Sequence, residues 1–206
     1  MATPNHQPIS RRGMMQAIGA CGAAALGASL AGAADEAAPP RPAGQSSSLG
    51  LKHPPLQTVR VGMIGVGGRG MSLLGELLNI DGVAVTAVGD VVPQRVEAAQ
   101  ARVVAKGQPS PAGYSKGETD FENLCQRDDV DLVYVATPWE WHAAMAVCAM
   151  NGGKHVAIEV PAAITLQECW DLVDASERTQ RHCLMLENCC YGETEMFVLN
   201  MVRQGV

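Results

Sequence analysis

From Val59 onward, short apolar runs alternate with stretches in which apolar positions recur at a helical period. The runs are nearly continuously apolar and rich in branched residues, as strands buried on both faces must be. They predict five strands, at 59–64, 83–89, 131–136, 155–159 and 182–186. The stretches between them predict five helices, at about 68–79, 93–106, 118–126, 140–151 and 166–179. This alternation predicts an α/β doubly wound fold, a parallel sheet with helices on its faces.

The helix expected at 166–179 shows the local signals most clearly. Thr165 and Glu168 have the spacing of a capping box, which satisfies backbone N–H groups at a helix start. Four of its larger apolar or weakly polar residues share one face, which we expect to pack on the sheet: Leu166, Cys169, Trp170 and Val173.

The first 33 residues have the pattern of an export signal. Arg11 and Arg12 precede an uncharged stretch of small and apolar residues that ends in a small-x-small site at 31–33. The arginine pair resembles a twin-arginine signal, which exports proteins already folded. We therefore expect a periplasmic or secreted protein without stable membrane insertion after cleavage. Two alternatives stay open: an uncleaved membrane anchor over 13–34, and lipidation at Cys21.

Residues 34–58 are rich in Pro, Ala, Gly and Ser and carry few large apolar side chains. Such a composition cannot bury a core, so it predicts a disordered, mobile linker.

Composition narrows the function classes. Hydrophobic residues make up 47% of the 206 residues, charged residues 17%, and the net charge is -6, as in ordinary soluble globular proteins. No cluster of Lys and Arg follows residue 60, so we expect no nucleic-acid partner. The seven cysteines show neither a CxxC pair nor a neighbouring His at zinc-ligand spacing, so we expect no metal site.

A glycine motif follows the first predicted strand directly. Gly65, Gly67 and Gly70 form a GxGxxG pattern that also opens the first predicted helix. In a Rossmann fold the first glycine permits a tight turn, the second lets the backbone approach a pyrophosphate, and the third lets helix and strand pack closely. Asp90 ends the second strand, 25 residues after Gly65. Its carboxylate would bind ribose hydroxyls and repel the extra phosphate of NADP, which predicts NAD. The alternative is a structural glycine turn beside a solvated aspartate.

Three further groups of residues stand at predicted strand ends, where open α/β sheets bind ligands. They are the ATPWEWH segment at 136–142, Glu159-Val160 and Glu187-Asn188. From composition alone, the two tryptophans of the first group would more often lie in a core, the two carboxylates on the surface, and Asn188 in a turn.

Together these motifs resemble the glucose-fructose oxidoreductase and inositol dehydrogenase (Gfo/Idh/MocA) family. Within it, the PWEWH and MLENCCY strings resemble glycoside hydrolase family 109, the NAD-dependent α-N-acetylgalactosaminidases. The resemblance spans about 59–206. It implies a Rossmann domain at 59–188 and, at 189–206, the start of a C-terminal α+β substrate domain whose remainder is missing. It also implies a homo-oligomer formed through that missing domain.

The resemblance also implies a reaction and a set of cofactor contacts. Tightly held NAD takes a hydride from C3 of the sugar, the glycosidic oxygen is eliminated, water adds and the hydride returns. The resemblance further implies a small glycoside as substrate and catalytic residues beyond Val206. Wider-family dehydrogenases carry a lysine where this chain has Val160, which cannot relay a proton. The NAD contacts that carry over are Gly68, Arg69, Asp90, Trp139, Glu140, Trp141, His142, Glu159, Val160 and Asn188.

Two competing functions stay open. One is an exported sugar oxidoreductase that exchanges its NAD, and the other is a non-enzymatic NAD-binding remnant.

Overall fold

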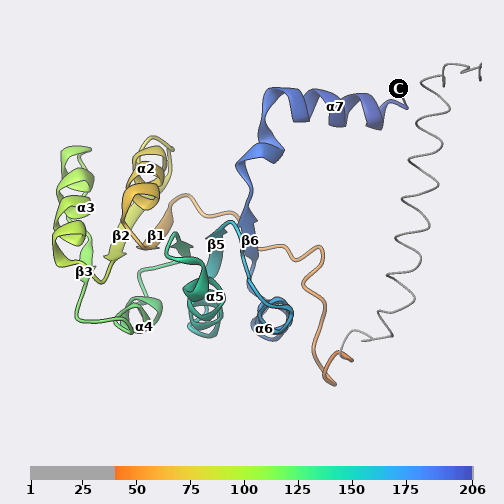
Figure 1. Cartoon of the computed structure of the whole chain (residues 1–206), viewed down its shortest axis with the longest axis horizontal. Coiled ribbons are helices and arrows are strands. Elements are labelled where there is room, and N and C mark those ends of the chain that lie inside the picture. The colour runs from red at the N-terminus through yellow and green to blue at the C-terminus, as the bar shows by residue number, and fades with distance from the viewer. Residues whose placement is uncertain (1–39, 206) are drawn as a thin grey trace, which may run out of the picture. The chain divides into compact units, whose positions relative to one another are not determined.

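A computed structural model describes residues 40–205 of the chain (Figure 1). The predicted export signal, membrane anchor and lipidation site fall on residues 1–39 and lie outside the described part. One compact unit, Ala43–Val206, contains all the elements. Its strands are β1 Val59–Ile64, β2 Val83–Gly89, β3 Ala112–Tyr114, β4 Leu132–Val135, β5 His155–Glu159 and β6 Cys183–Leu186. Its helices are α2 Gly68–Leu77, α3 Pro93–Ala105, α4 Phe121–Cys125, α5 His142–Asn151, α6 Leu166–Thr179 and α7 Glu193–Arg203, with short 3₁₀ turns at Trp139–Trp141 and Asn188–Tyr191.

The six strands form one all-parallel sheet in the order β3-β2-β1-β4-β5-β6. The order therefore reverses between β1 and β4, and this switch point is where doubly wound sheets open a ligand crevice. Helices α2 and α3 lie on one side of the sheet and α4, α5 and α6 on the other (Figure 1). Each face has its own buried core, so the predicted α/β doubly wound fold is confirmed.

The apolar runs located five of the six strands to within one residue at each end. β3 was missed because it has only three residues, Ala-Gly-Tyr, and pairs with β2 alone at the sheet edge. The helix predicted at 118–126 is a shorter α4, and the one predicted at 140–151 begins with the 3₁₀ turn at Trp139–Trp141. Helix α7 was not predicted, and none of its residues is buried.

Helix α6 begins as predicted but buries a different face, and it packs mainly on α5. The Thr165 side chain accepts the backbone N–H of Glu168, and the Glu168 side chain accepts the N–H of Thr165, so the capping box is confirmed. The face predicted to be buried is wrong, since Leu166 is 59% and Val173 45% exposed. The buried residues are instead Leu172, Ala175, Ser176 and Glu177. Cys169, Leu172 and Val173 border an apolar groove beside β6.

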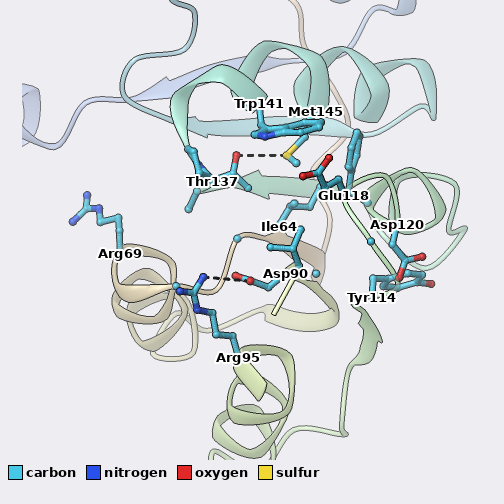
Figure 2. Close-up of a pocket in the computed structure, with 18 of the residues that line it drawn as sticks. Ile64, Arg69, Asp90, Arg95, Tyr114, Glu118, Asp120, Thr137, Trp141 and Met145 are labelled. Carbon is cyan, nitrogen blue, oxygen red and sulfur yellow. Dashed lines mark hydrogen bonds and ion pairs between the residues drawn. The ribbon is translucent and has the colours of Figure 1, made fainter. Parts of the chain in front are cut away.

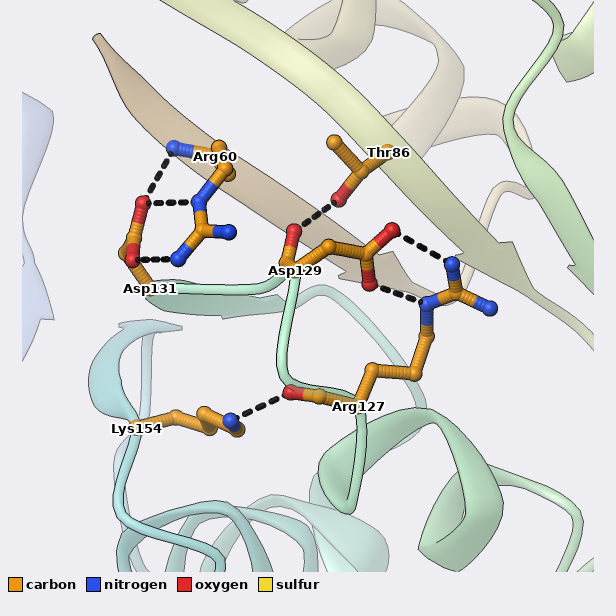
Figure 3. A network of polar contacts seen from close by, with 6 residues as sticks. All are labelled: Arg60, Thr86, Arg127, Asp129, Asp131 and Lys154. Atoms are coloured by element: carbon orange, nitrogen blue, oxygen red, sulfur yellow. Dashed lines mark hydrogen bonds and ion pairs between the residues drawn. The ribbon is translucent and has the colours of Figure 1, made fainter.

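A polar network joins the amino-terminal ends of the strands (Figure 3). Arg60 on β1 holds Asp131, just before β4, through bonds of 2.9 Å from Nε and 2.5 Å from Nη2. This guanidinium lowers the pKa of the Asp131 carboxyl. Arg127 binds Asp129 in the same way. The Arg127 carbonyl oxygen accepts a hydrogen bond from the ammonium group of buried Lys154. The network fixes the sheet at the edge opposite the glycine motif.

The segment before β1 forms no helix or strand over residues 40–58, yet it contacts the domain. The Gln45 amide donates to Asp174 on α6, and the Gln180 amide donates to the Ser46 carbonyl at 3.0 Å. The composition predicted a mobile linker here, whereas these contacts hold part of it against α6. Among the described residues no helix is both long and apolar enough for a membrane span.

Candidate functional site

The turn after β1 requires glycine at two positions. Gly65 has a φ of +86°, and a Cβ there would lie 2.6 Å from the Ala136 carbonyl oxygen. A Cβ on Gly70 would lie 1.9 Å from the Gly65 carbonyl oxygen, so only glycine lets α2 begin this close to β1. These are the tight-turn and close-packing roles that the motif predicted.

The first turn of α2 has backbone N–H groups suited to an anion. Gly67 is the N-cap residue, it provides no side-chain cap, and the first turn contains no acidic residue. Unpaired N–H groups and the helix dipole at such a terminus attract phosphate. A Cβ on Gly68 would meet nothing within 4 Å, and one on Gly67 would point toward Arg95 at 3.6 Å. The backbone is therefore open to a ligand here, as a pyrophosphate requires.

Asp90 lies at the end of β2 with its side chain only 6% exposed. One carboxylate oxygen accepts the Val66 N–H at 3.0 Å, and the other accepts the Val92 N–H at 3.0 Å. Arg95 on α3 approaches the second oxygen at 3.4 Å, as Figure 2 shows. These bonds fix the carboxylate beside the glycine motif, where a ribose of a dinucleotide would lie.

These groups line one cavity of about 380 Å³ at the carboxyl-terminal edge of the sheet. Backbone bonds hold the strand ends around it: the N–H of Ala136 donates to Ile64 and the N–H of Asp90 donates to Tyr114. Beyond Asp90 the wall continues along the chain segment that follows β3, and on the other side the Thr137 hydroxyl contacts the sulfur of Met145 at 3.5 Å (Figure 2). The cavity thus spans the switch point between β1 and β4.

The motifs predicted contact residues on one side of this cavity but not on the other. Of the predicted contacts, the lining includes Gly65, Gly67, Gly68, Arg69, Asp90 and Trp141. The side chains that sequence reasoning missed include Arg95, Tyr114, Glu118, Asp120, Phe121, Thr137 and Met145. Thr137 lies in the ATPWEWH segment but was not among the predicted contacts, whereas the others end or follow β3 or lie on helices, where no motif marks them. Asp120 is buried, and hydrogen bonds from the Lys116 backbone and the Asn123 side chain lower its pKa, so its carboxylate adds negative charge to this end of the cavity.

The PWEWH residues occupy different environments. Trp141 packs edge-to-face on Phe121, with ring centroids 6.2 Å apart, and lines the cavity. Trp139 is 61% exposed and Glu140 is also exposed. His142 is buried, with Nδ1 2.7 Å from the Pro161 carbonyl oxygen and Nε2 2.8 Å from that of Thr137. The imidazole thereby connects the loops after β4 and β5, and its predicted contact with a cofactor stays a prediction.

Two of the remaining predicted residues, Glu159 and Asn188, line a second cavity of about 270 Å³, which Arg69 also borders. Arg69 on α2 binds Glu159 at the end of β5 through two bonds of 3.2 Å. The Tyr134 hydroxyl donates to the same carboxylate at 3.3 Å. Burial and the charge of Glu159 raise the pKa of Tyr134, so the phenol stays protonated at neutral pH. Asn188 lines this cavity too, while Val160 lies next to Glu159 with 36% of its surface exposed.

Comparison with known proteins agrees with this geometry. Residues 59–187 match the model of a family described as an oxidoreductase family with an NAD-binding Rossmann fold. Among curated proteins, the chain is 52% identical over 199 residues to a glycosyl hydrolase family 109 protein of Saccharopolyspora erythraea, covering 97% of this chain and 43% of that protein. A protein of the same name from Solibacter usitatus is 53% identical over 200 residues, covering 96% of this chain and 43% of that protein. The chain thus spans less than half the length of these relatives.

Solved structures show the same fold. An NAD-binding protein from Listeria innocua superposes with a TM-score of 0.60 at 26% identity, over 72% of this chain and 41% of that one. The WlbA dehydrogenase from Bordetella pertussis, solved with NADH and UDP-GlcNAcA, gives a TM-score of 0.63 at 20% identity, over 72% and 40% of the two chains.

Proposed function

The chain belongs to the oxidoreductase family with an NAD-binding Rossmann fold, and on this premise we propose that the full protein is an exported NAD-dependent glycosidase. The proposed substrate is a glycoside with a terminal α-linked N-acetylgalactosamine. The likeness to family 109 glycosyl hydrolases over nearly all of this chain carries the proposal. The cavity at the switch point supports it, because it offers the groups that a dinucleotide needs.

Each part of the cavity would bind one part of NAD. The N–H groups at the start of α2 would bind the pyrophosphate, with Gly67 leaving room for it. Asp90 would accept hydrogen bonds from the adenosine ribose hydroxyls and would repel the additional phosphate of NADP. Trp141 and Thr137, on the β4 side, would flank the nicotinamide half.

When bound, NAD supplies a hydride acceptor, so that transient oxidation at C3 of the sugar would allow elimination of the glycosidic oxygen, addition of water and reduction back. This chain's residues would position the reacting ring rather than exchange protons with it. Val160 has no ionisable group, and Tyr134 keeps its proton through burial and its bond to Glu159. Under the proposal, proton transfer and sugar recognition belong to the part of the protein outside this chain. The carboxylates of this chain would therefore not serve as the acid and nucleophile of a conventional glycosidase.

The test uses the full-length protein, purified without added cofactor. Denatured samples are examined for released NAD by chromatography, and hydrolysis of p-nitrophenyl α-N-acetylgalactosaminide is followed without added NAD. Retained NAD with hydrolysis and no net NADH supports the glycosidase. Net NADH production with a free sugar would instead establish a sugar oxidoreductase with exchangeable cofactor, and dinucleotide binding without either reaction would indicate a non-enzymatic protein.

Export of the folded protein is a second part of the proposal and rests on Arg11 and Arg12. The protein would acquire NAD in the cytoplasm and carry it across the membrane. Fractionation of cells that express the protein, or a variant with both arginines changed to lysine, tests this. The wild type should appear in the periplasm or medium with bound NAD, and the variant should stay in the cytoplasm. Equal distribution of the two proteins would exclude this route.

A further inference from the structure

Three histidines meet at the amino-terminal edge of the sheet, the edge opposite the dinucleotide cavity. His53 comes from the segment before β1, His155 is the first residue of β5, and His182 immediately precedes β6. One ring nitrogen from each lies within 4.8 Å of the others. The ring centroids are 4.4 Å apart for His53 and His155, 5.3 Å for His53 and His182, and 5.1 Å for His155 and His182. Three of the five histidines of the chain therefore share one small region.

Hydrogen bonds define which nitrogens of this cluster carry lone pairs. His53 Nε2 lies 3.1 Å from the Gln180 carbonyl oxygen, which only accepts, so Nε2 holds the proton and Nδ1 the lone pair. This is the outer hydrogen bond that commonly orients a metal-bound imidazole. His155 Nδ1 also has a lone pair and accepts the His182 N–H at 3.0 Å. That N–H lies at an exposed position, so water could replace this acceptor if a metal took the lone pair.

We propose that His53, His155 and His182 form a binding site for a divalent transition-metal ion, with Zn²⁺ as the reference ion. Zinc binds imidazole nitrogens at about 2.0–2.1 Å in a tetrahedral arrangement, which brings ligand atoms to about 3.3 Å from one another. The present separations, within 4.8 Å, exceed this by at most about 1.5 Å, and the side chain of His182 is exposed. Three neutral imidazoles would leave the fourth position open to water or another ligand.

The chemistry of the cluster selects among metals. Hard cations such as Mg²⁺ and Ca²⁺ require oxygen ligands, whereas imidazole suits Zn²⁺, Ni²⁺ and Cu²⁺. Asp131, just before the neighbouring strand β4, is held by Arg60, and Arg181 directly precedes His182. This environment disfavours ions bound by charge alone and favours ions that bond strongly to neutral nitrogen.

The site would fasten the segment before β1 to the sheet. Hydrogen bonds from Gln45 to Asp174 and from Gln180 to Ser46 already hold this segment against α6. A metal bridging His53 to His155 and His182 would add a cross-link at its far end, just before β1. The three ligands come from separate segments, so the spacing of residues in the sequence could not reveal the site and predicted no metal.

The experiment uses full-length protein carrying a tag without histidine, treated with EDTA and dialysed. Calorimetric titration with ZnCl₂ is compared between the wild type, His182→Ala and His53→Ala, with Lys52→Ala as the matched control on the same segment. Loss of an outer-sphere partner alone typically weakens metal affinity by about 10–100-fold, so loss of a ligand should weaken one zinc equivalent by at least about tenfold. Lys52→Ala should bind zinc like the wild type.

Circular dichroism and the content of bound NAD serve as checks that each variant is folded, since the cluster is remote from the cavity. Should His53→Ala fold poorly, His182→Ala decides the matter, because its side chain is exposed and its backbone bond to His155 is retained. Absence of zinc binding by the wild type, or equal zinc stoichiometry and affinity in the wild type and both histidine variants, would overturn the proposal. These outcomes are independent of whether the protein is a glycosidase.

Discussion

Replacing Gly70 by alanine tests the close packing of α2 on β1 directly. The added Cβ would lie 1.9 Å from the Gly65 carbonyl oxygen, so backbone atoms would have to separate by about 1 Å. Overpacking a core typically costs about 1–3 kcal/mol, and a clash with backbone belongs at the upper end, about 3 kcal/mol. For a domain of 150–250 residues each kcal/mol lowers Tm by about 2–4 °C, so the shift should be roughly 6–12 °C.

The matched control is Gly68→Ala in the same turn, because a Cβ there would meet nothing within 4 Å. Alanine favours a helix over glycine by up to about 1 kcal/mol, so this variant should be as stable as the wild type or slightly more so. Urea unfolding followed by circular dichroism, with the cofactor removed, gives the free energy of unfolding of all three proteins. If Gly70→Ala lay within about 0.5 kcal/mol of the wild type, the assignment of Gly70 to helix–strand packing would be refuted.

Three further predictions concern single side chains. Asp90→Ala removes hydrogen bonds to a charged group, worth about 1.5–3 kcal/mol, so the affinity for NAD should fall about 10–100-fold. The affinity for NADP should fall less. Calorimetry with both dinucleotides measures this change in preference. Thr165→Ala removes the cap of α6 and should cost about 1 kcal/mol in urea unfolding, whereas Thr165→Ser should keep most of it. The Arg60 bond lowers the pKa of folded Asp131, so its stabilisation is present above the unfolded pKa and is lost as pH falls through the folded pKa. Thermal melts should therefore show a stability gap between the wild type and Asp131→Asn at pH 6 that closes toward pH 3.

The parts of the fold that sequence predicted well are those where one physical demand dominates. A strand buried on both faces must be apolar throughout, so β1, β2, β4 and β5 could be located from composition alone. The turn after β1 must contain glycine, because Gly65 has a positive φ and Gly70 touches backbone. In both cases local sequence and tertiary packing require the same residues.

The parts that sequence missed depend on contacts between distant segments. The buried face of α6 includes polar Ser176 and Glu177 and follows from packing against α5 rather than from the spacing of its larger apolar residues. Tyr114 lines the cavity only because the short β3 pairs with β2. Likewise, His53 meets the two strand-end histidines only after the segment before β1 has folded back, which no periodicity encodes.

The bonds made by Asp90 bear on the kinetics of cofactor exchange. A carboxylate oxygen has two lone pairs, and the Oδ1 atom already uses both, one for Val92 and one for Arg95. Oδ2 accepts only the Val66 N–H, so one ribose hydroxyl could bind there, whereas a second hydroxyl bound at Oδ1 must displace the half-exposed guanidinium. Binding of the dinucleotide would then exchange Arg95 for a ribose hydroxyl at Oδ1. Added salt weakens the Asp90–Arg95 ion pair and should therefore speed association of the dinucleotide.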